Sequence, residues 1–274
     1  QNYFGSINHQ CLREFLDLKI KDGVIRKMID KWLKAGIFEN GQVTYPTEGT
    51  PQGGSVSPLL SNVYLHYVLD TWFKEQIQPL LRGGSFIIRF ADDFLLGFTN
   101  REDAFRVMEV LPKRLGKFGL TLHPEKTRLI DLEGEKKGGN HPIKTFDFLG
   151  FTHYMSKSRK GKTILKRKTS SKKLNQALKR LSDWIKCYRH KLPMRELIGE
   201  LNQKLRGHYA YYGITFNCRK LHTYYNRTKH LLHKWLNHRG GKRVWTWNKI
   251  AKLTTEWLPL IRPKIYHSYQ LAKP

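Results

Sequence analysis

The sequence predicts an α+β protein in which a mixed unit of helices and strand pairs is followed by a basic, all-helical unit. Apolar residues recur at helical spacing in several segments, and two short apolar runs in the first half have the length of strands. The charge balance changes at residue 157: from this residue onward there are 30 Lys and Arg but four acids. We therefore expect a mixed unit at residues 1–156, a basic helical unit at 157–250 and a C-terminal extension at 251–274.

The first helices are predicted from apolar spacing and from capping residues. Residues 8–18 place Leu12, Phe15 and Leu16 on one helical face, and Asp22 is a suitable N-cap for the next helix. A helix should also follow Asn100, because Asn is a favoured N-cap and Asp103 lies at the capping-box position.

Another helix should begin where a Ser-Pro pair precedes a run of apolar residues. Ser57 is typical of an N-cap and Pro58 of the first helical position. We expect its inward-facing residues to be Leu59, Leu60, Val63, Tyr64, Tyr67 and Val68.

Strands are predicted at residues 85–90 and 94–99, where two apolar runs are joined by Ala91, Asp92 and Asp93. This arrangement indicates a β-hairpin with acids at its tip. Further strand-like runs at 127–132 and 145–154 complete the mixed unit. In the basic part, helical periodicity predicts helices near residues 171–190, 194–212 and 219–239.

The paired acids at the hairpin tip break a local rule, because like charges repel and tight turns favour Asn-Gly or Asp-Gly. A bound cation would remove that repulsion. Mg²⁺ takes one or two carboxylates together with water and phosphate oxygens, so Asp92 and Asp93 suit Mg²⁺, with Mn²⁺ as the alternative ion. The other interpretation is a solvated turn, in which Asp is common.

A net charge of +28 favours a polyanionic partner, nucleic acid before a membrane surface, and no run approaches the roughly 20 apolar residues of a membrane span. Neutralising phosphates releases counterions, so a basic cluster should bind nucleic acid in a salt-dependent manner. The alternative is a solvated charged face. The candidate cluster consists of Lys166, Arg167, Lys168, Lys172 and Lys173.

Aromatic residues are interleaved with the basic ones, and some could stack on unpaired bases. Most are expected in the core, since Trp184 and Tyr188 share one helical face. Three scattered cysteines indicate a reducing compartment, and with the 12 histidines they lack the four-ligand spacing of a zinc site. We therefore expect no zinc.

Several motifs follow one another in a fixed order. Residues 49–62 read GTPQGGSVSPLLSN, residues 90–93 read FADD, and residues 119–127 read GLTLHPEKT. Residues 148–151 then read FLGF, and residues 206–213 read RGHYAYYG. Together they resemble the reverse transcriptases encoded by group II introns, also called maturases. The resemblance covers nearly the whole chain and implies a right-hand polymerase palm with residual finger elements, followed by a helical thumb or X domain.

The resemblance implies roles for individual residues. Asp92 and Asp93 match the paired metal-binding acids, and Lys126 matches a lysine that could donate a proton to the leaving pyrophosphate. The remaining matches are Phe4, Gln52, Gly53 and Ala91 as nucleotide contacts, with Phe4 beneath the sugar, and Phe148, Leu149 and Gly150 as the primer grip. A third metal-binding acid is expected upstream of Gln1, so we expect this chain alone to be incomplete as a polymerase.

The resemblance implies an RNA-directed DNA polymerase that uses dNTPs to extend a DNA primer on an RNA template and that binds intron RNA to assist splicing. Its expected location is the cytoplasm of a bacterial-type cell, with an organelle as the alternative. Two other functions stay open: a splicing cofactor without polymerase activity, and a reverse transcriptase of a defence or CRISPR-associated system.

Overall fold

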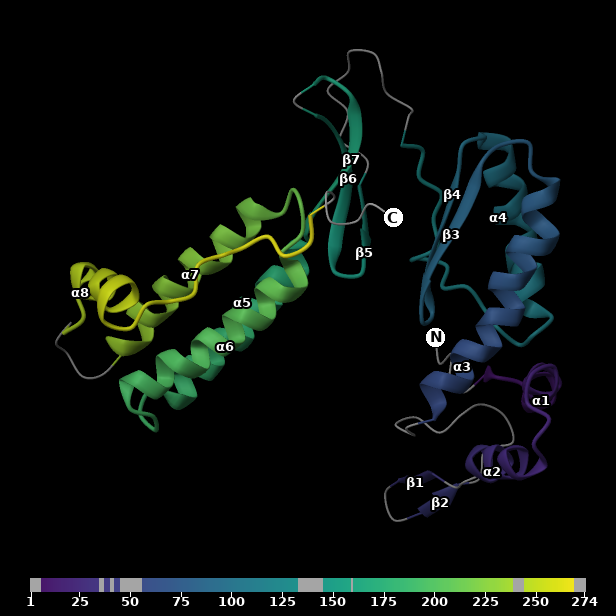
Figure 1. The fold of residues 1–274 in the computed structure, drawn as a ribbon, viewed down its shortest axis with the longest axis horizontal. Coiled ribbons are helices and arrows are strands. Elements are labelled where there is room, and N and C mark those ends of the chain that lie inside the picture. Colours follow the sequence, from purple (N-terminus) through teal and green to yellow (C-terminus); the bar gives the residue numbers. More distant parts are fainter. Residues whose placement is uncertain are drawn as a thin grey trace. The chain divides into compact units, whose positions relative to one another are not determined.

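The chain forms two compact units, residues 1–131 and 132–274 (Figure 1). The computed structural model describes residues 6–34, 37–39, 42–44, 56–132, 145–158, 160–238 and 244–268. The division falls earlier than the expected boundary at residue 156, so the sheet formed by residues 145–169 belongs to the second unit. The mixture of helices and antiparallel sheets confirms the predicted α+β class.

The first unit consists mainly of helices packed behind one hairpin. Its elements are α1 (His9–Asp17), α2 (Gly23–Leu33), β1 (Ile37–Glu39), β2 (Gln42–Thr44), α3 (Ser57–Leu65), η2 (His66–Ile77), η3 (Gln78–Leu80), β3 (Ser85–Phe90), β4 (Asp93–Phe98) and α4 (Arg101–Gly116). Helix α3 continues without a break into the π-helical segment η2, which sequence periodicity did not predict.

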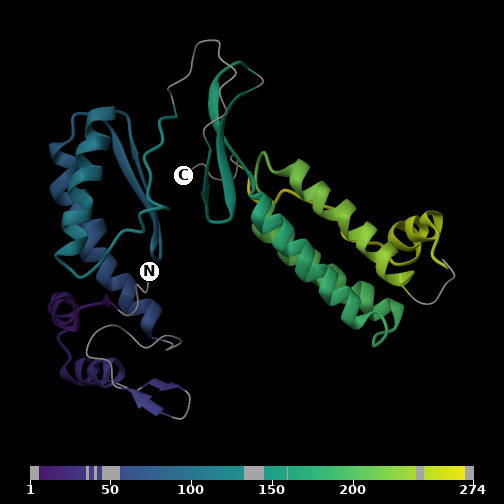
Figure 2. The same cartoon turned by 180° about the vertical axis from the view of Figure 1, so that it is seen from behind.

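The core of the first unit lies between its long helices and one face of the β3–β4 hairpin. Tyr64 and Phe73 are fully buried, and Val107 of α4 packs in the same cluster. The hairpin adds Ile87 and Leu96, which are partly buried against this core. Figure 2 shows the hairpin lying along the helices.

Two helix caps predicted from the sequence are confirmed. The Asp22 carboxylate accepts hydrogen bonds from the backbone N–H groups of Val24 and Ile25, at 2.7 and 3.2 Å. The Asn100 side chain accepts one from the N–H of Glu102 at 2.8 Å. These bonds satisfy donors that the first helical turn leaves without backbone partners.

The predicted start of α3 is wrong by one residue. Val56 is the N-cap, and its apolar side chain has no atom that could accept a cap hydrogen bond. Its backbone is already close to helical, so Ser57 lies inside the helix. Leu59 is also misplaced, since it is 65% exposed. Successive helical residues differ by about 100° in direction, and burial of Leu60 and Tyr64 turns Leu59 outward.

Asp103 does not complete a capping box. Its carboxylate accepts the backbone N–H groups of Arg82 and Gly83, both at 2.9 Å, and thereby holds the loop before β3 against α4. Two fixed donors from this loop satisfy the carboxylate better than the single N–H that a capping box offers.

The second unit contains a three-stranded antiparallel sheet and a helical bundle. Its elements are β5 (Thr145–Phe148), β6 (Phe151–Lys157), β7 (Thr163–Thr169), α5 (Ser171–Tyr188), α6 (Met194–Tyr212), α7 (Cys218–Leu236), α8 (Trp247–Lys252) and η4 (Leu253–Trp257). The three helices predicted for this region are confirmed as α5, α6 and α7, which run side by side in both views (Figures 1 and 2).

The strand predictions around this sheet need three corrections. Residues 127–132 form no strand, because apolar spacing alone does not supply a partner strand. The single strand expected at 145–154 is in fact the β5–β6 hairpin. Its two-residue turn was not predicted because the first turn residue is Leu149, an apolar residue that is unusual at a positive φ, here 49°. Strand β7 was not predicted, since its sequence is rich in Lys.

The C-terminal segment is part of the second core. Leu260 is buried among α5–α7 residues, and Asn202 of α6 binds the backbone of both Pro259 and Ile261. Further on, His267 forms a parallel bridge with Ile214. Figure 1 shows this segment in yellow along α7, so the predicted extension packs on the bundle.

Candidate active site and nucleic-acid interface

The acidic motif lies on a tight two-residue turn. Phe90 pairs with Asp93, which is the first residue of β4, so only Ala91 and Asp92 lie between the strands. Ala91 has a positive φ of 53°. A positive φ at the first central residue is typical of a type II′ hairpin turn, where Gly is usual. The sequence therefore places Ala in a position that costs backbone strain.

Both carboxylates at this tip are exposed. Within the described residues, neither Asp92 nor Asp93 takes part in an ion pair. Two adjacent carboxylates with hard oxygen donors fit an ion that completes its shell with water and phosphate oxygens, as Mg²⁺ does. The described part of the chain contains no group of three or more His, Cys, Asp or Glu residues placed to hold a metal.

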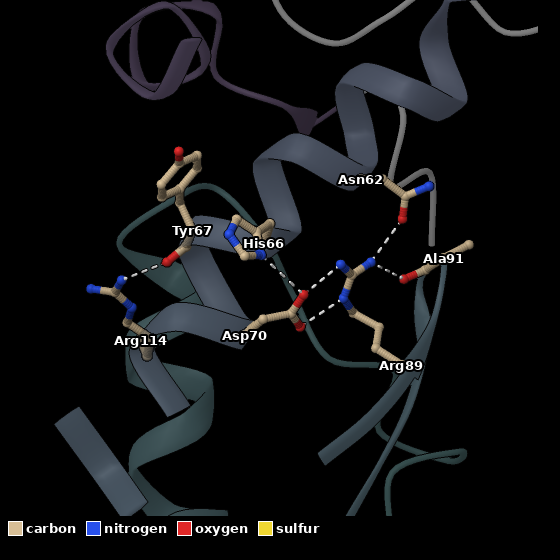
Figure 3. A network of polar contacts seen from close by, with 7 residues as sticks. All are labelled: Asn62, His66, Tyr67, Asp70, Arg89, Ala91 and Arg114. Carbon is tan, nitrogen blue, oxygen red and sulfur yellow. Dashed lines mark hydrogen bonds and ion pairs between the residues drawn. The ribbon is translucent and has the colours of Figure 1, made fainter. Parts of the chain in front are cut away.

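A network around Arg89 connects the turn to the helix behind it (Figure 3). The guanidinium donates to both carboxylate oxygens of Asp70 on η2, from Nε at 2.8 Å and from Nη2 at 2.6 Å. Its Nη1 donates to the Asn62 side chain on α3 at 2.8 Å and to the Ala91 carbonyl at 3.1 Å. His66 Nδ1 lies 3.6 Å from Asp70.

These partners were not singled out in the sequence. One available signal was Arg89 itself, a charged residue at an inward position of an apolar strand. Such a residue is seldom buried without a partner, which predicts an acid nearby but does not identify it.

Among the other predicted site residues of the first unit, Lys126 is exposed on a short turn. Its backbone N–H donates a hydrogen bond to the His123 carbonyl at 3.2 Å. It belongs to the same compact unit as the acids. Phe4, Gln52 and Gly53 lie outside the described residues.

The FLGF motif forms the turn of the β5–β6 hairpin, where Phe148 pairs with Phe151 across Leu149 and Gly150. The Leu149 carbonyl accepts a hydrogen bond from the Tyr211 hydroxyl at 2.9 Å. Gly150 has a φ of 79°, and its carbonyl accepts the N–H of Ser170 at 3.0 Å. The predicted primer-grip residues are thus fixed to α6 and to the start of α5.

This turn brings together two motifs that are about 60 residues apart in the sequence. Phe151 of FLGF stacks on Tyr211 of RGHYAYYG, with ring centroids 5.8 Å apart, and meets Tyr212 edge-on at 5.2 Å. A Cβ on Gly150 would lie 3.0 Å from the Tyr212 hydroxyl, so a larger residue would displace this contact. The sheet and the bundle are joined closely at this corner.

A buried Asn fixes the same corner from the other side. The Asn217 side chain donates to the Thr169 hydroxyl at 2.7 Å and to the Tyr212 carbonyl at 2.8 Å. It also accepts the Thr169 N–H at 2.8 Å. Because Asn217 and Thr169 are both buried, losing either one would leave polar groups of the other unsatisfied.

The residues of the predicted basic cluster lie on two elements, and those on strand β7 point to opposite faces of that strand. Lys166 lies beside the Phe216 ring and Lys168 beside the Tyr154 ring, at 5.4 and 4.9 Å from the ring centroids. Arg167 lies between them and points to the opposite face of the strand. Lys172 and Lys173 are exposed in the first turn of α5.

Tyr209, Tyr224, Tyr225 and Trp235 are buried in the core of the bundle, and Trp184 and Tyr212 pack against it. Trp184 stacks on Tyr188 at 5.5 Å, as their spacing predicted, and the Lys204 ammonium lies 4.7 Å from the Trp184 ring. Tyr211 is the most exposed of the motif tyrosines, at 54%.

His208 is a partly buried titratable group in the bundle. Its ring stacks on Tyr224 of α7 at 3.7 Å, and within the described residues its Nε2 has no hydrogen-bond partner. Burial disfavours the charged form and lowers the pKa of His208 to about 4.

Among the described residues, no helix has the length and apolar character needed to span a membrane.

Comparison with known proteins places this arrangement in a family. The family model described as reverse transcriptase (RNA-dependent DNA polymerase) matches residues 1–153, more than half of the chain. The chain therefore belongs to the reverse transcriptase family. Within it, the predicted resemblance to group II intron-encoded reverse transcriptases is confirmed by the relatives.

Three relatives illustrate this similarity. The chain is 51% identical to the group II intron-encoded protein LtrA of Lactococcus lactis subsp. cremoris over 23% of this chain and 10% of the relative. It is 46% identical to an uncharacterized 91 kDa protein in the cob intron of Schizosaccharomyces pombe, over 23% and 8%. Protein YkfC of Escherichia coli is 29% identical over 58% and 46%. Each match covers less than half of the relative's length.

Proposed function

We propose that this chain is the catalytic and RNA-binding part of an RNA-directed DNA polymerase of the group II intron type. It would extend a DNA primer on an RNA template with dNTPs and bind intron RNA to assist splicing. The observation that carries the proposal is the exposed pair Asp92–Asp93 on a hairpin tip that is fixed to a helix, within a reverse transcriptase family match.

In this proposal the chain mainly positions reactants and supplies charge. Asp92 and Asp93 would hold Mg²⁺, or Mn²⁺ in its place, which stabilises charge on the transferring phosphoryl group. Lys126 would donate a proton to the leaving pyrophosphate. Nucleotide contacts are assigned to Phe4, Gln52, Gly53 and Ala91.

The second unit would hold the nucleic acid. Phe148, Leu149 and Gly150 would contact the primer end, and Lys173 favours this assignment because its side chain lies beside Gly150. Phosphate contacts are assigned to Lys166, Arg167, Lys168, Lys172 and Lys173.

The test is Mg²⁺-dependent dNTP incorporation on an RNA template with an annealed DNA primer. It compares the chain and an N-terminally extended form with their Asp92→Ala variants, and Glu75→Ala, an exposed acid on η2, serves as the control. We expect Asp92→Ala to abolish incorporation, about 10³-fold or more, while Glu75→Ala retains it. Incorporation that survives Asp92→Ala would overturn the proposed catalytic role.

A splicing cofactor without polymerase activity is the second candidate. It is favoured by the second unit, which has its own core and carries most of the positive charge. If no form incorporates dNTPs, and reversing the charges of Lys172 and Lys173 abolishes splicing assistance while Asp92→Ala does not, this candidate replaces the polymerase.

A further inference from the structure

The Arg89 guanidinium donates hydrogen bonds to groups around the acidic turn and not to Asp92 or Asp93. Four of its hydrogen bonds go to Asp70, Asn62 and the Ala91 carbonyl. A guanidinium offers five N–H donors, so nearly all are used. Its side chain is only 13% exposed, and that of Asp70 is 26% exposed.

We infer that Arg89 is a positioning residue that fixes the acid-bearing turn to the α3–η2 helix. This inference rests on the proposed function, because it assigns Arg89 a role in placing Asp92 and Asp93. Arg89 is the residue through which Asn62, at the end of the TPQGGSVSPLLSN motif, is joined to the FADD motif. Figure 3 shows the guanidinium with Asp70 on one side and with Asn62 and Ala91 on the other.

The electrostatics of the network favour positioning over charge neutralisation. Asp70 binds Arg89 through both carboxylate oxygens, at 2.8 and 2.6 Å, and so offsets its positive charge. An Arg that neutralised Asp92 or Asp93 directly would compete with a cation for the same oxygens. The pairing with Asp70 leaves those two carboxylates available.

The turn needs such an anchor because its strand pairing alone leaves the tip weakly held. The hairpin has two strands, its tip is exposed, and Ala91 has a left-handed backbone that costs free energy. A hydrogen bond to the Ala91 carbonyl fixes the peptide immediately before Asp92. Displacing a reacting group by about 1 Å can lower a rate about 10²-fold.

The test substitution is Arg89→Lys, which keeps the charge but cannot bind Asp70 through two nitrogens while reaching Asn62 and Ala91. The control is Arg13→Lys, which alters the Arg13–Asp30 pair, 2.7 Å long, on α1 and α2. The measurements are hydrogen–deuterium exchange of the peptide covering residues 86–96, RNA affinity, and kcat and KM for dNTP in the active form.

We expect Arg89→Lys to lower kcat about 10²-fold, with KM and RNA affinity within about twofold of wild type, and to speed exchange at residues 86–96. Arg13→Lys should leave all of these quantities at their wild-type values. A purely structural role would instead reduce the folded fraction of Arg89→Lys without lowering kcat per folded molecule. Unchanged exchange and kcat in folded Arg89→Lys would overturn the inference.

A second variant keeps the inference testable if Arg89→Lys does not fold. Asn62→Leu removes one acceptor of Nη1 at an exposed position, whereas Asn62→Asp retains an acceptor. We expect faster exchange at the turn in Asn62→Leu and the wild-type rate in Asn62→Asp. Equal rates in both would refute the anchor. If wild type itself incorporates no dNTP, the polymerase proposal fails, while the exchange data still decide whether Arg89 fixes the turn.

Discussion

At the scale of single residues, Ala91 is where the local sequence and the backbone disagree. Its φ of 53° lies in the left-handed region, which costs an L-residue with a Cβ about 1 kcal/mol relative to Gly. We therefore predict that Ala91→Gly raises the free energy of unfolding by about 1 kcal/mol and the midpoint of thermal unfolding by about 2 to 4 °C. The Ala91 carbonyl that Arg89 binds is retained in this variant.

A second Ala-to-Gly change provides the control for this stability measurement. Ala104 lies in α4, where Gly costs backbone entropy, so Ala104→Gly should lower the free energy of unfolding by about 1 kcal/mol. Calorimetry or urea unfolding of the three proteins separates the two effects. If Ala91→Gly also destabilised the protein, the methyl group would be making a contact worth more than the strain.

The candidate site was only partly predictable from the sequence at this scale. The paired acids were found because adjacent carboxylates in an apolar hairpin are unusual and because the surrounding motif is long. Arg89 could have been noticed as a charged residue in an apolar strand. Its partners Asn62 and Asp70 could not, since they lie 27 and 19 residues away and only tertiary packing brings them together.

At the scale of elements, helices were predicted better than strands. Helix signals are local, because apolar spacing and a capping residue such as Asp22 or Asn100 lie in the same short segment. Strands depend on a distant partner, which is why residues 127–132 were assigned to a strand that does not form. Strand β7 was missed because its Lys-rich sequence becomes a strand through pairing with β6.

The contact between α6 and α7 predicts a pH dependence of stability. The pKa of His208 is lowered to about 4 by burial against Tyr224, whereas an unfolded His titrates near 6.5. Below pH 6.5 the unfolded chain therefore binds a proton that the folded chain does not. Stability should fall between pH 6.5 and 4, by on the order of 1 kcal/mol per pH unit, and be fully retained above pH 6.5.

Urea unfolding at several pH values measures this effect. The variant His208→Phe removes the titrating group but keeps an aromatic ring, so its stability should depend less on pH between 6.5 and 4 than that of wild type. His222→Gln, at an exposed position of α7, should retain the wild-type dependence. Equal slopes in wild type and His208→Phe would show that another group is responsible.

At the scale of the whole molecule, the two structural units also differ in their charge. Residues 132–274 carry most of the positive charge and form their own core, whereas the paired acids lie in residues 1–131. The charge asymmetry was visible in the sequence. The division before β5 was not, because the contacts that attach this sheet to the bundle, such as Tyr211 with Leu149, join distant residues.

Together with the proposed RNA binding, this division predicts which lysines determine the salt dependence of that binding. Each phosphate contact contributes about 0.7 to 0.9 to the slope of log affinity against log salt concentration, because its counterion is released. Lys172 and Lys173 are exposed in the first turn of α5, so replacing both with Gln should reduce the slope by about 1 to 2. The matched pair Lys27 and Lys31 is exposed on α2 of the first unit, and its replacement by Gln should leave the slope unchanged. Filter-binding or fluorescence titrations at 50 to 300 mM salt, roughly the range in which such slopes are measured, give the comparison. A larger change from the α2 pair than from the α5 pair would mean that the RNA contacts the first unit, and the assignment of the basic cluster would be wrong.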